Sequence, residues 1–223
     1  RSLMTFATIE HALEQLRSGR PVLVLDDEDR ENEGDAILAA ELASPQWVGW
    51  MVRHTSGYLC APMEDTRADR LGLPLMWSAN TDPLRTRYTV SVDVSTSTTG
   101  ISSVERAATT RALADPRTTS ADLIRPGHVL PLRARDGGVL TRRGHTEAAV
   151  DLTRLAGLQA VGLIGEIVHD DGTCARTPDV LALGQAEGLD VITIESLANW
   201  RRSHEEQPST TTPGSSTIRV SPT

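Results

Sequence analysis

Lysine is the first absence in this sequence: all 22 basic residues in a chain of 223 are arginine. Arginine stays protonated in proteins and forms no Schiff base with a carbonyl group. Schiff-base aldolases, pyridoxal phosphate enzymes and nucleotide hydrolases with a Walker motif each depend on a lysine. The missing lysine therefore excludes these three classes of enzyme.

The sequence also lacks long apolar runs and an excess of positive charge. No run approaches the roughly 20 residues that cross a bilayer, and residues 1–10 contain no secretory signal core. A net charge of -8 argues against nucleic acid and anionic membranes as partners. The two cysteines, Cys60 and Cys174, are expected to be reduced thiols. We therefore expect a cytoplasmic protein.

Helical and strand-like patterns alternate along the chain, which is typical of a layered α/β sheet with helices on its faces. Helices are expected at residues 9–18, 45–51, 64–71, 102–114, 145–156 and 195–202, and from 177 onward. Strands are expected at 21–25, 58–63, 88–93, 128–132, 161–168 and 190–194, with a short apolar segment at 36–40. The Ser/Thr/Pro-rich segment 203–223 is expected to be a flexible tail.

An acidic run from Asp26 to Asp35 directly follows the strand expected at 21–25. Ligands of open α/β sheets bind at the carboxyl ends of strands, so this position suits a functional site. A divalent cation would relieve the repulsion among crowded carboxylates, and Arg30 within the run suits an anionic substrate. The alternative is a solvated acidic turn, which is the more common role of a charge run. The strand-end position and Gly34 favour the functional interpretation.

A second candidate site is the segment Arg142 to Glu147, where glycine-containing chain turns into a helix. A helix start offers free N–H groups and a positive dipole end, which suit a phosphate group, and arginines add charged hydrogen bonds. His145 lies beside them with a ring nitrogen available. The alternative for His145 is an ordinary surface or capping residue, which is the commoner role on general grounds.

Four smaller signals remain open between function and structure. Thr98 to Ser102 precedes a helix and could bind an anion or simply cap that helix through Thr99 or Ser102. His128 starts a strand. Glu166 lies inside an apolar run, where it is either a catalytic base or half of a structural ion pair. Cys60 is more readily core filler than a nucleophile.

Together these segments resemble the 3,4-dihydroxy-2-butanone 4-phosphate synthases of riboflavin biosynthesis, from about Thr8 to Arg202. The matching strings are LDDEDRENEGD (25–35), RHTSGYLC (53–60), YTVSVD (88–93), TTGIS (98–102), RPGHVLPLRA (125–134) and GHTEAAVDL (144–152). The resemblance implies a layered α-β-α sandwich with a mixed sheet and a catalytic domain over residues 1–202. It also implies a homodimeric lyase, with active sites near the interface, that needs Mg²⁺ or Mn²⁺. Its reaction would convert D-ribulose 5-phosphate to L-3,4-dihydroxy-2-butanone 4-phosphate and formate.

The resemblance also assigns roles to single residues by their place in the matching strings. Glu31 and His145 would hold the metal and contact the substrate. His128 and Glu166 match positions essential for catalysis, and Cys60 and Asp35 are further catalytic candidates. The other substrate contacts would be Arg30, Asp35, Thr99, Arg142, Gly144, Thr146 and Glu166.

Three positions depart from the family pattern. The loop from Asp93 to Thr98 is one residue shorter than usual, Gly165 replaces a cysteine, and Glu105 replaces an aspartate. Many relatives also carry a GTP cyclohydrolase II domain on the carboxyl side. Two alternatives therefore stay open: a diverged enzyme for another phosphorylated ketose, or a non-catalytic dimeric partner protein.

Overall fold

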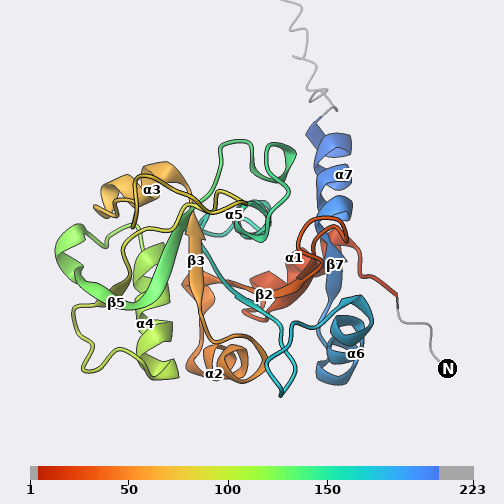
Figure 1. Ribbon diagram of the computed structural model, residues 1–223, viewed down its shortest axis with the longest axis horizontal. Helices are drawn as coiled ribbons and strands as arrows, with labels where there is room; N and C mark the ends of the chain where they lie inside the picture. The colour runs from red at the N-terminus through yellow and green to blue at the C-terminus, as the bar shows by residue number, and fades with distance from the viewer. Residues whose placement is uncertain (1–4, 206–223) are drawn as a thin grey trace, which may run out of the picture.

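A mixed seven-stranded sheet forms the centre of the protein, in the order β4-β5-β3-β6-β2-β1-β7; the computed structural model describes residues 5–205 (Figure 1). The strands are β1 (Val22–Leu25), β2 (Gly34–Ala39), β3 (Cys60–Met63), β4 (Val92–Val94), β5 (Leu123–Arg133), β6 (Gly162–Glu166) and β7 (Val191–Thr193). The helices are α1 (Ile9–Arg17), α2 (Pro45–His54), α3 (Asp65–Arg70), α4 (Ser103–Ala114), α5 (His145–Leu155), α6 (Thr177–Glu187) and α7 (Ile194–Glu205). Strand β1 runs parallel to β7, and β3 runs parallel to β5; the other neighbours are antiparallel.

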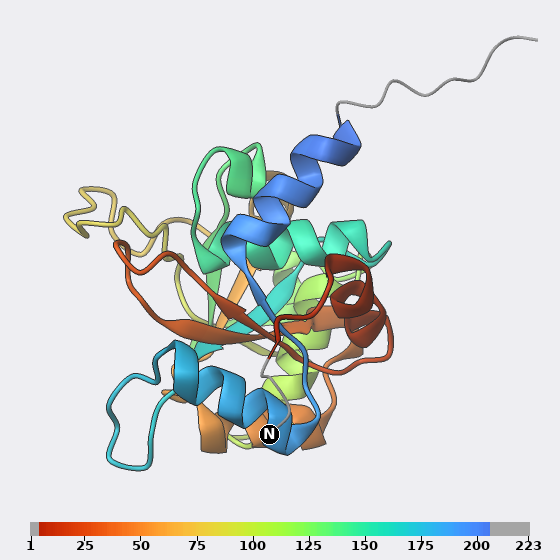
Figure 2. The ribbon, with the colours of Figure 1, turned by 90° about the vertical axis from the view of Figure 1, so that its right-hand side faces the viewer.

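Alternate residues of the central strands face opposite helical layers. Leu23 and Leu25 of β1 belong to a core that includes Met51 of α2. Val24, which lies between them in sequence, belongs to a second core with Leu152 of α5. Figure 2 shows α5 and α7 on one side of the sheet and α6 on the other. Because successive side chains of a strand point to opposite faces, both faces are buried, and the expected α-β-α sandwich with a mixed sheet is confirmed.

Side-chain caps explain where several helices begin. Thr8, Ser44 and Ser102 each accept a hydrogen bond from the backbone N–H three residues further on, at the starts of α1, α2 and α4. These oxygens satisfy donors that have no partner inside the helix. The helix starts expected from these residues are confirmed.

Several expected boundaries differ from the structure; β5, for example, begins at Leu123 rather than at His128. The ladder of β4 contains only Val92–Val94, because Tyr88 and Thr89 form only isolated bridges to β5 and to Leu75. Helix α7 continues to Glu205, beyond the expected end at Arg202. Residues 206–223 of the expected tail lie outside the described part of the chain. Among the helices of residues 5–205, none has the length and apolar character that crossing a membrane requires.

Four strand ends meet at one end of the sheet, and this arrangement builds the candidate site. Leu25 at the end of β1 pairs with Gly34 at the start of antiparallel β2. Asp35 pairs with Glu166, the last residue of β6, and β3 starts beside β6 with Cys60. The acidic run therefore lies next to Glu166 although more than 130 positions separate Asp35 from it in the sequence.

Candidate active site

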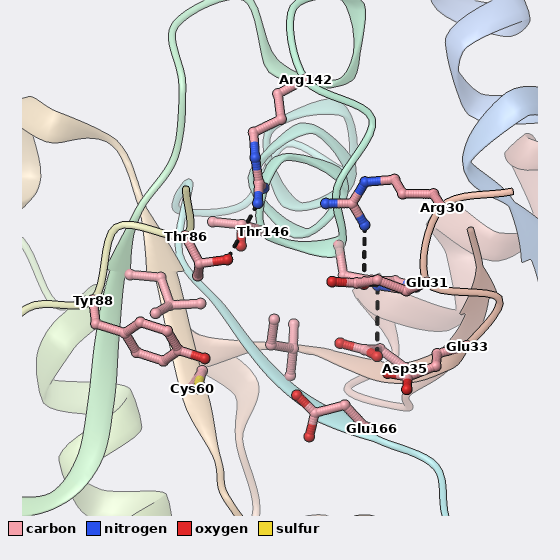
Figure 3. A pocket seen from close by; sticks show the side chains of 13 residues that line it. Arg30, Glu31, Glu33, Asp35, Cys60, Thr86, Tyr88, Arg142, Thr146 and Glu166 are labelled. Carbon is pink, nitrogen blue, oxygen red and sulfur yellow. Dashed lines mark hydrogen bonds and ion pairs between the residues drawn. The ribbon is translucent and has the colours of Figure 1, made fainter. Parts of the chain in front are cut away.

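A pocket opens at this end of the sheet, with about 430 Å³ of empty space, part of it open to solvent (Figure 3). Charged side chains from distant segments line it together with a few apolar ones. The lining residues are Arg30, Glu31, Glu33, Asp35, Cys60, Thr86, Tyr88, Leu132, Arg142, His145, Thr146, Ile164 and Glu166. The acidic run, the segment around His145 and Glu166 are thus brought together, as the sequence predicts.

Asp26 organises the acidic loop between β1 and β2. Its carboxylate accepts hydrogen bonds from the backbone N–H groups of Glu31 and Glu33, each at 3.0 Å, and from the Arg30 guanidinium at 3.0 Å. The Asp26 side chain is fully buried, so the loop closes around its own carboxylate. The run is therefore an ordered loop that holds Glu31 and Glu33 against the pocket, and the interpretation as a solvated turn is wrong for this part.

His145 is the first residue of α5 and is almost completely buried. Its Nε2 lies 3.0 Å from the carbonyl oxygen of Val24, which can only accept a hydrogen bond, so Nε2 carries a proton. The other ring nitrogen, Nδ1, lies 3.5 Å from Glu31 Oε2 and 3.6 Å from Asp35 Oδ1. In the neutral ring, the Nδ1 lone pair therefore faces two carboxylates.

The pKa values of this group reflect its crowding. Burial raises the pKa of Asp35 to about 8, even though His145 acts in the opposite direction. Burial also disfavours the charged ring of His145, but the carboxylates of Asp35, Glu31 and Asp26 outweigh it and raise the pKa of His145 to about 9. In the protein alone, a proton on His145 therefore compensates part of the negative charge.

The donor set around His145 fits a divalent cation. Asp35 Oδ1 is buried and has no hydrogen-bond partner among the described residues. Asp26, Glu31 and His145 present ligand atoms that all lie within 4.8 Å of one another. Ligands on one edge of a Mg²⁺ coordination octahedron are about 3 Å apart, close to the separations from His145 Nδ1. The predicted pair of metal ligands, Glu31 and His145, therefore shares one site, and Asp35 and Asp26 are candidate ligands that the sequence prediction left out.

The opposite wall of the pocket suits an anion. Arg142 donates to Glu147 at 2.7 Å, to Thr86 at 3.2 Å and to a carbonyl oxygen at 3.0 Å, which fixes its guanidinium group. Thr146 lies beside it in the first turn of α5, whose N-cap Gly144 offers no side chain to the free N–H groups. A Cβ at Gly144 would lie 2.3 Å from Arg142 Nη1, so a side chain at this position would displace the guanidinium group.

Cys60 lines the floor of the pocket with its side chain almost fully buried. Burial raises the pKa of the Cys60 thiol far above its ordinary value, and Glu166 and Asp35 raise it further. The thiol is therefore protonated at neutral pH. It can fill space or donate a weak hydrogen bond, but a thiolate nucleophile is not favoured here.

His128 and Thr99 do not line this pocket. His128 Nδ1 lies 2.8 Å from Asp93 Oδ2, and its backbone N–H donates to Asp93 Oδ1 at 2.8 Å. Gly100, next to Thr99, packs directly on that carboxylate, because a Cβ at Gly100 would lie 2.1 Å from Asp93 Oδ2. These residues form a second group, here called the His128 cluster (Asp93, Thr99, Gly100, Glu105 and His128). The structure of one chain does not join this group to the pocket.

Several lining residues were missed by sequence reasoning. They are Thr86, Tyr88, Leu132 and Ile164. Ile164 lies two positions before Glu166 on β6, and the alternation of a strand places both side chains on one face. That rule could have identified Ile164. Thr86 lies in an irregular segment, and no local pattern indicates it.

Comparisons with known proteins agree on one family. Residues 10–200 match the family described as 3,4-dihydroxy-2-butanone 4-phosphate synthase. The riboflavin biosynthesis protein RibBA of Salinispora arenicola is 56% identical over 206 residues, which cover 92% of this chain and 49% of that protein. RibBA of Mycobacterium tuberculosis is 54% identical over 202 residues, covering 89% and 48%. This chain thus spans about half the length of the curated relatives it matches.

Solved structures show the same fold. A 3,4-dihydroxy-2-butanone 4-phosphate synthase in complex with two magnesium ions superposes with a TM-score of 0.85 at 43% identity, over 90% of this chain and 99% of that one. The synthase of Candida albicans superposes with a TM-score of 0.82 at 47% identity, over 88% and 98%.

Proposed function

This chain belongs to the 3,4-dihydroxy-2-butanone 4-phosphate synthase family, and we propose that it catalyses the reaction for which that family is named. The substrate would be D-ribulose 5-phosphate, and the products L-3,4-dihydroxy-2-butanone 4-phosphate and formate. The observation that carries the proposal is one pocket that joins a candidate cation site, an anion-binding wall and Glu166. The relatives' names support a role in riboflavin biosynthesis. The cytoplasmic location stays a prediction.

Glu31 and His145 would hold a Mg²⁺ or Mn²⁺ ion, with Asp35 as a further oxygen donor. The Val24 carbonyl keeps the proton of neutral His145 on Nε2 and so leaves Nδ1 for the metal. When bound, the cation would act as a Lewis acid that polarises the ketone of the sugar. A family structure that contains two magnesium ions supports this assignment.

The phosphate group would bind at the start of α5. Arg142 and Thr146 lie on that wall of the pocket, and the first-turn N–H groups of α5 add the positive end of the helix dipole. Arg30, which also lines the pocket, lies 2.9 Å from Glu31 Oε2 and balances its charge. The sugar chain would then extend from the phosphate wall towards Glu166 and the acidic loop.

Glu166 would move protons during the reaction. Removing a proton beside a ketone needs a base within about 3 Å of that proton. Glu166 lines the pocket at the end of β6, and its Oε1 atom accepts no hydrogen bond from the described residues. This oxygen is therefore free to accept a proton from the bound sugar and return it in a later step.

We further propose that two copies of the chain form a homodimer in which the His128 cluster of one subunit completes the pocket of the other. The ring of His128 is 41% exposed in the single chain. Large apolar side chains that are exposed flank the cluster: Ile101 and Val104 near its loop, and Ile124, which pairs with Asp93. An exposed apolar group of this kind is typical of a subunit interface.

The direct test is formate release. The purified chain is incubated with ribulose 5-phosphate and Mg²⁺, formate is measured with formate dehydrogenase, and the phosphorylated product is identified by NMR. We expect formate and product in equal amounts, no reaction with EDTA, and only a small residual rate of the E166Q variant. A well-folded protein that releases no formate, or that prefers another phosphorylated ketose, would contradict the proposal. The alternative of a non-catalytic partner protein predicts full cellular function for E166Q.

A further inference from the structure

The turn between α2 and β3 contacts the candidate base directly. The hydroxyl of Ser56 lies 2.6 Å from Glu166 Oε2, and the backbone N–H of Ser56 donates to the carbonyl oxygen of Glu166 at 2.8 Å. Ser56 is not one of the residues that line the pocket. It therefore contacts Glu166 without itself lining the pocket.

The direction of these hydrogen bonds follows from the donors present. The backbone N–H of Tyr58 lies 3.2 Å from Ser56 Oγ and can only donate, so the Ser56 oxygen accepts from it. The hydroxyl proton of Ser56 then points at Glu166 Oε2, which accepts it as a carboxylate. Hydrogen bonds arranged in such a chain strengthen one another. One carboxylate oxygen is thus held, and Oε1 is left without a hydrogen bond from the described residues.

The turn itself is firmly anchored. The hydroxyl of Thr55 donates to the carbonyl oxygen of Met51 at 2.6 Å and accepts from the N–H of Gly57 at 3.1 Å. The buried guanidinium of Arg106 on α4 donates to the carbonyl oxygen of Gly57 at 3.1 Å. These contacts fix the backbone on both sides of Ser56 and keep its hydroxyl group within reach of Glu166.

Gly165 lets the turn lie close to β6. A Cβ at Gly165 would lie 2.7 Å from Thr55 Oγ1 and 3.0 Å from its Cβ, which is closer than side chains normally approach. The position that departs from the family pattern therefore borders the turn that holds Glu166.

We propose that Ser56 is a positioning residue that orients the Glu166 carboxylate for proton transfer. This inference rests on the proposed function, in which Glu166 accepts a proton from the sugar. Ser56 acts only through Glu166, because it makes no contact with the pocket.

The first test compares S56A with the wild type under the formate assay. We expect kcat to fall about tenfold or more, the effect of losing a hydrogen bond to a charged group, while KM stays within about twofold. Ser56 is exposed, so the melting temperature should hardly change. S56T, which keeps a hydroxyl group, should restore most of the lost activity. S18A, a matched change at an exposed serine of the α1 C-cap, should leave kcat unchanged.

A double-mutant cycle separates positioning from an independent role. If Ser56 acts through Glu166, adding S56A to E166Q should lower the residual rate no further. A wild-type kcat in S56A would overturn the proposal, and so would an additional loss in the double variant.

A crystal structure of S56A gives a readout that does not need turnover. The Glu166 carboxylate should leave its position or occupy more than one rotamer, whereas an unchanged single position would overturn the proposal. If the wild type releases no formate, the proposed function fails, and this structure still decides whether Ser56 positions Glu166.

Discussion

The pocket beside α5 and the His128 cluster carry similar kinds of residue but differ in how far one chain encloses them. In the pocket, His145 is 5% exposed and Asp35 is 2% exposed, and both face partners from the same chain. In the His128 cluster, Asp93 fixes one ring nitrogen of His128, and the side chain is 41% exposed. The exposed side of His128 is free to meet groups of a second chain, which is why we propose that a second chain completes this site.

The largest expected effect concerns the metal ligand in the pocket. H145N and H145Q should each lower kcat/KM about 1,000-fold or more, because a bound Lewis acid lowers the activation free energy by several kcal/mol. The Asn amide occupies the place of Nδ1, and the Gln amide reaches that of Nε2. H145N should therefore bind Mn²⁺ more tightly than H145Q in a calorimetric titration, and the reverse order would contradict the assignment of Nδ1.

The next effect tests whether the two regions meet across subunits. H128N alone should lower kcat about 100-fold or more, as expected for the loss of a catalytic acid or base. Mixed dimers of H128N and E166Q subunits contain one site with both residues intact. Random mixing should therefore restore about a quarter of the wild-type activity. No recovery in verified mixed dimers would place His128 in the pocket of its own chain.

A smaller effect is the pH dependence of metal binding. The pKa of His145 is raised to about 9, so below that pH the ring carries a proton that the metal must displace. The dissociation constant for Mn²⁺ should therefore increase at least about tenfold from pH 8 to pH 7. H128N should show the same dependence, because His128 is not one of the candidate metal ligands. A dissociation constant that does not change with pH would show that His145 is not a ligand.

The smallest effect concerns Glu105, which organises the loop of the His128 cluster. Its carboxylate accepts hydrogen bonds from Thr98 and from the N–H of Gly100. The hydrogen bonds from Thr98 lower the pKa of Glu105 to about 2, so it is ionised at neutral pH. E105Q should weaken the loop and lower kcat/KM about threefold, whereas E105D should lower it less. Wild-type kcat/KM in both variants would show that this loop does not contribute to the site.

The strongest sequence predictions were those with a local cause. Thr8 and Ser102 start helices because their side chains cap them, and the acidic run lies at a strand end because β1 is followed by an ordered loop. These features depend on neighbours in the chain. The sequence alone could therefore locate them.

Other features depend on distant contacts. The free Nδ1 of His145 follows from a carbonyl group at Val24, and the orientation of Glu166 follows from Ser56. No local pattern links these pairs, which are 121 and 110 positions apart. Resemblance to the family joined His128 and Glu166 in one list of essential residues. Only the structure shows that, within one chain, His128 lies outside the pocket that Glu166 lines.

The most direct test of the central claim is the anomalous scattering of Mn²⁺ in crystals of this protein. We predict a peak about 2.2 Å from both His145 Nδ1 and a carboxylate oxygen of Glu31, with the Nε2 contact to Val24 retained. A peak bound to Nε2, or no peak between these two residues at saturating Mn²⁺, would contradict the account.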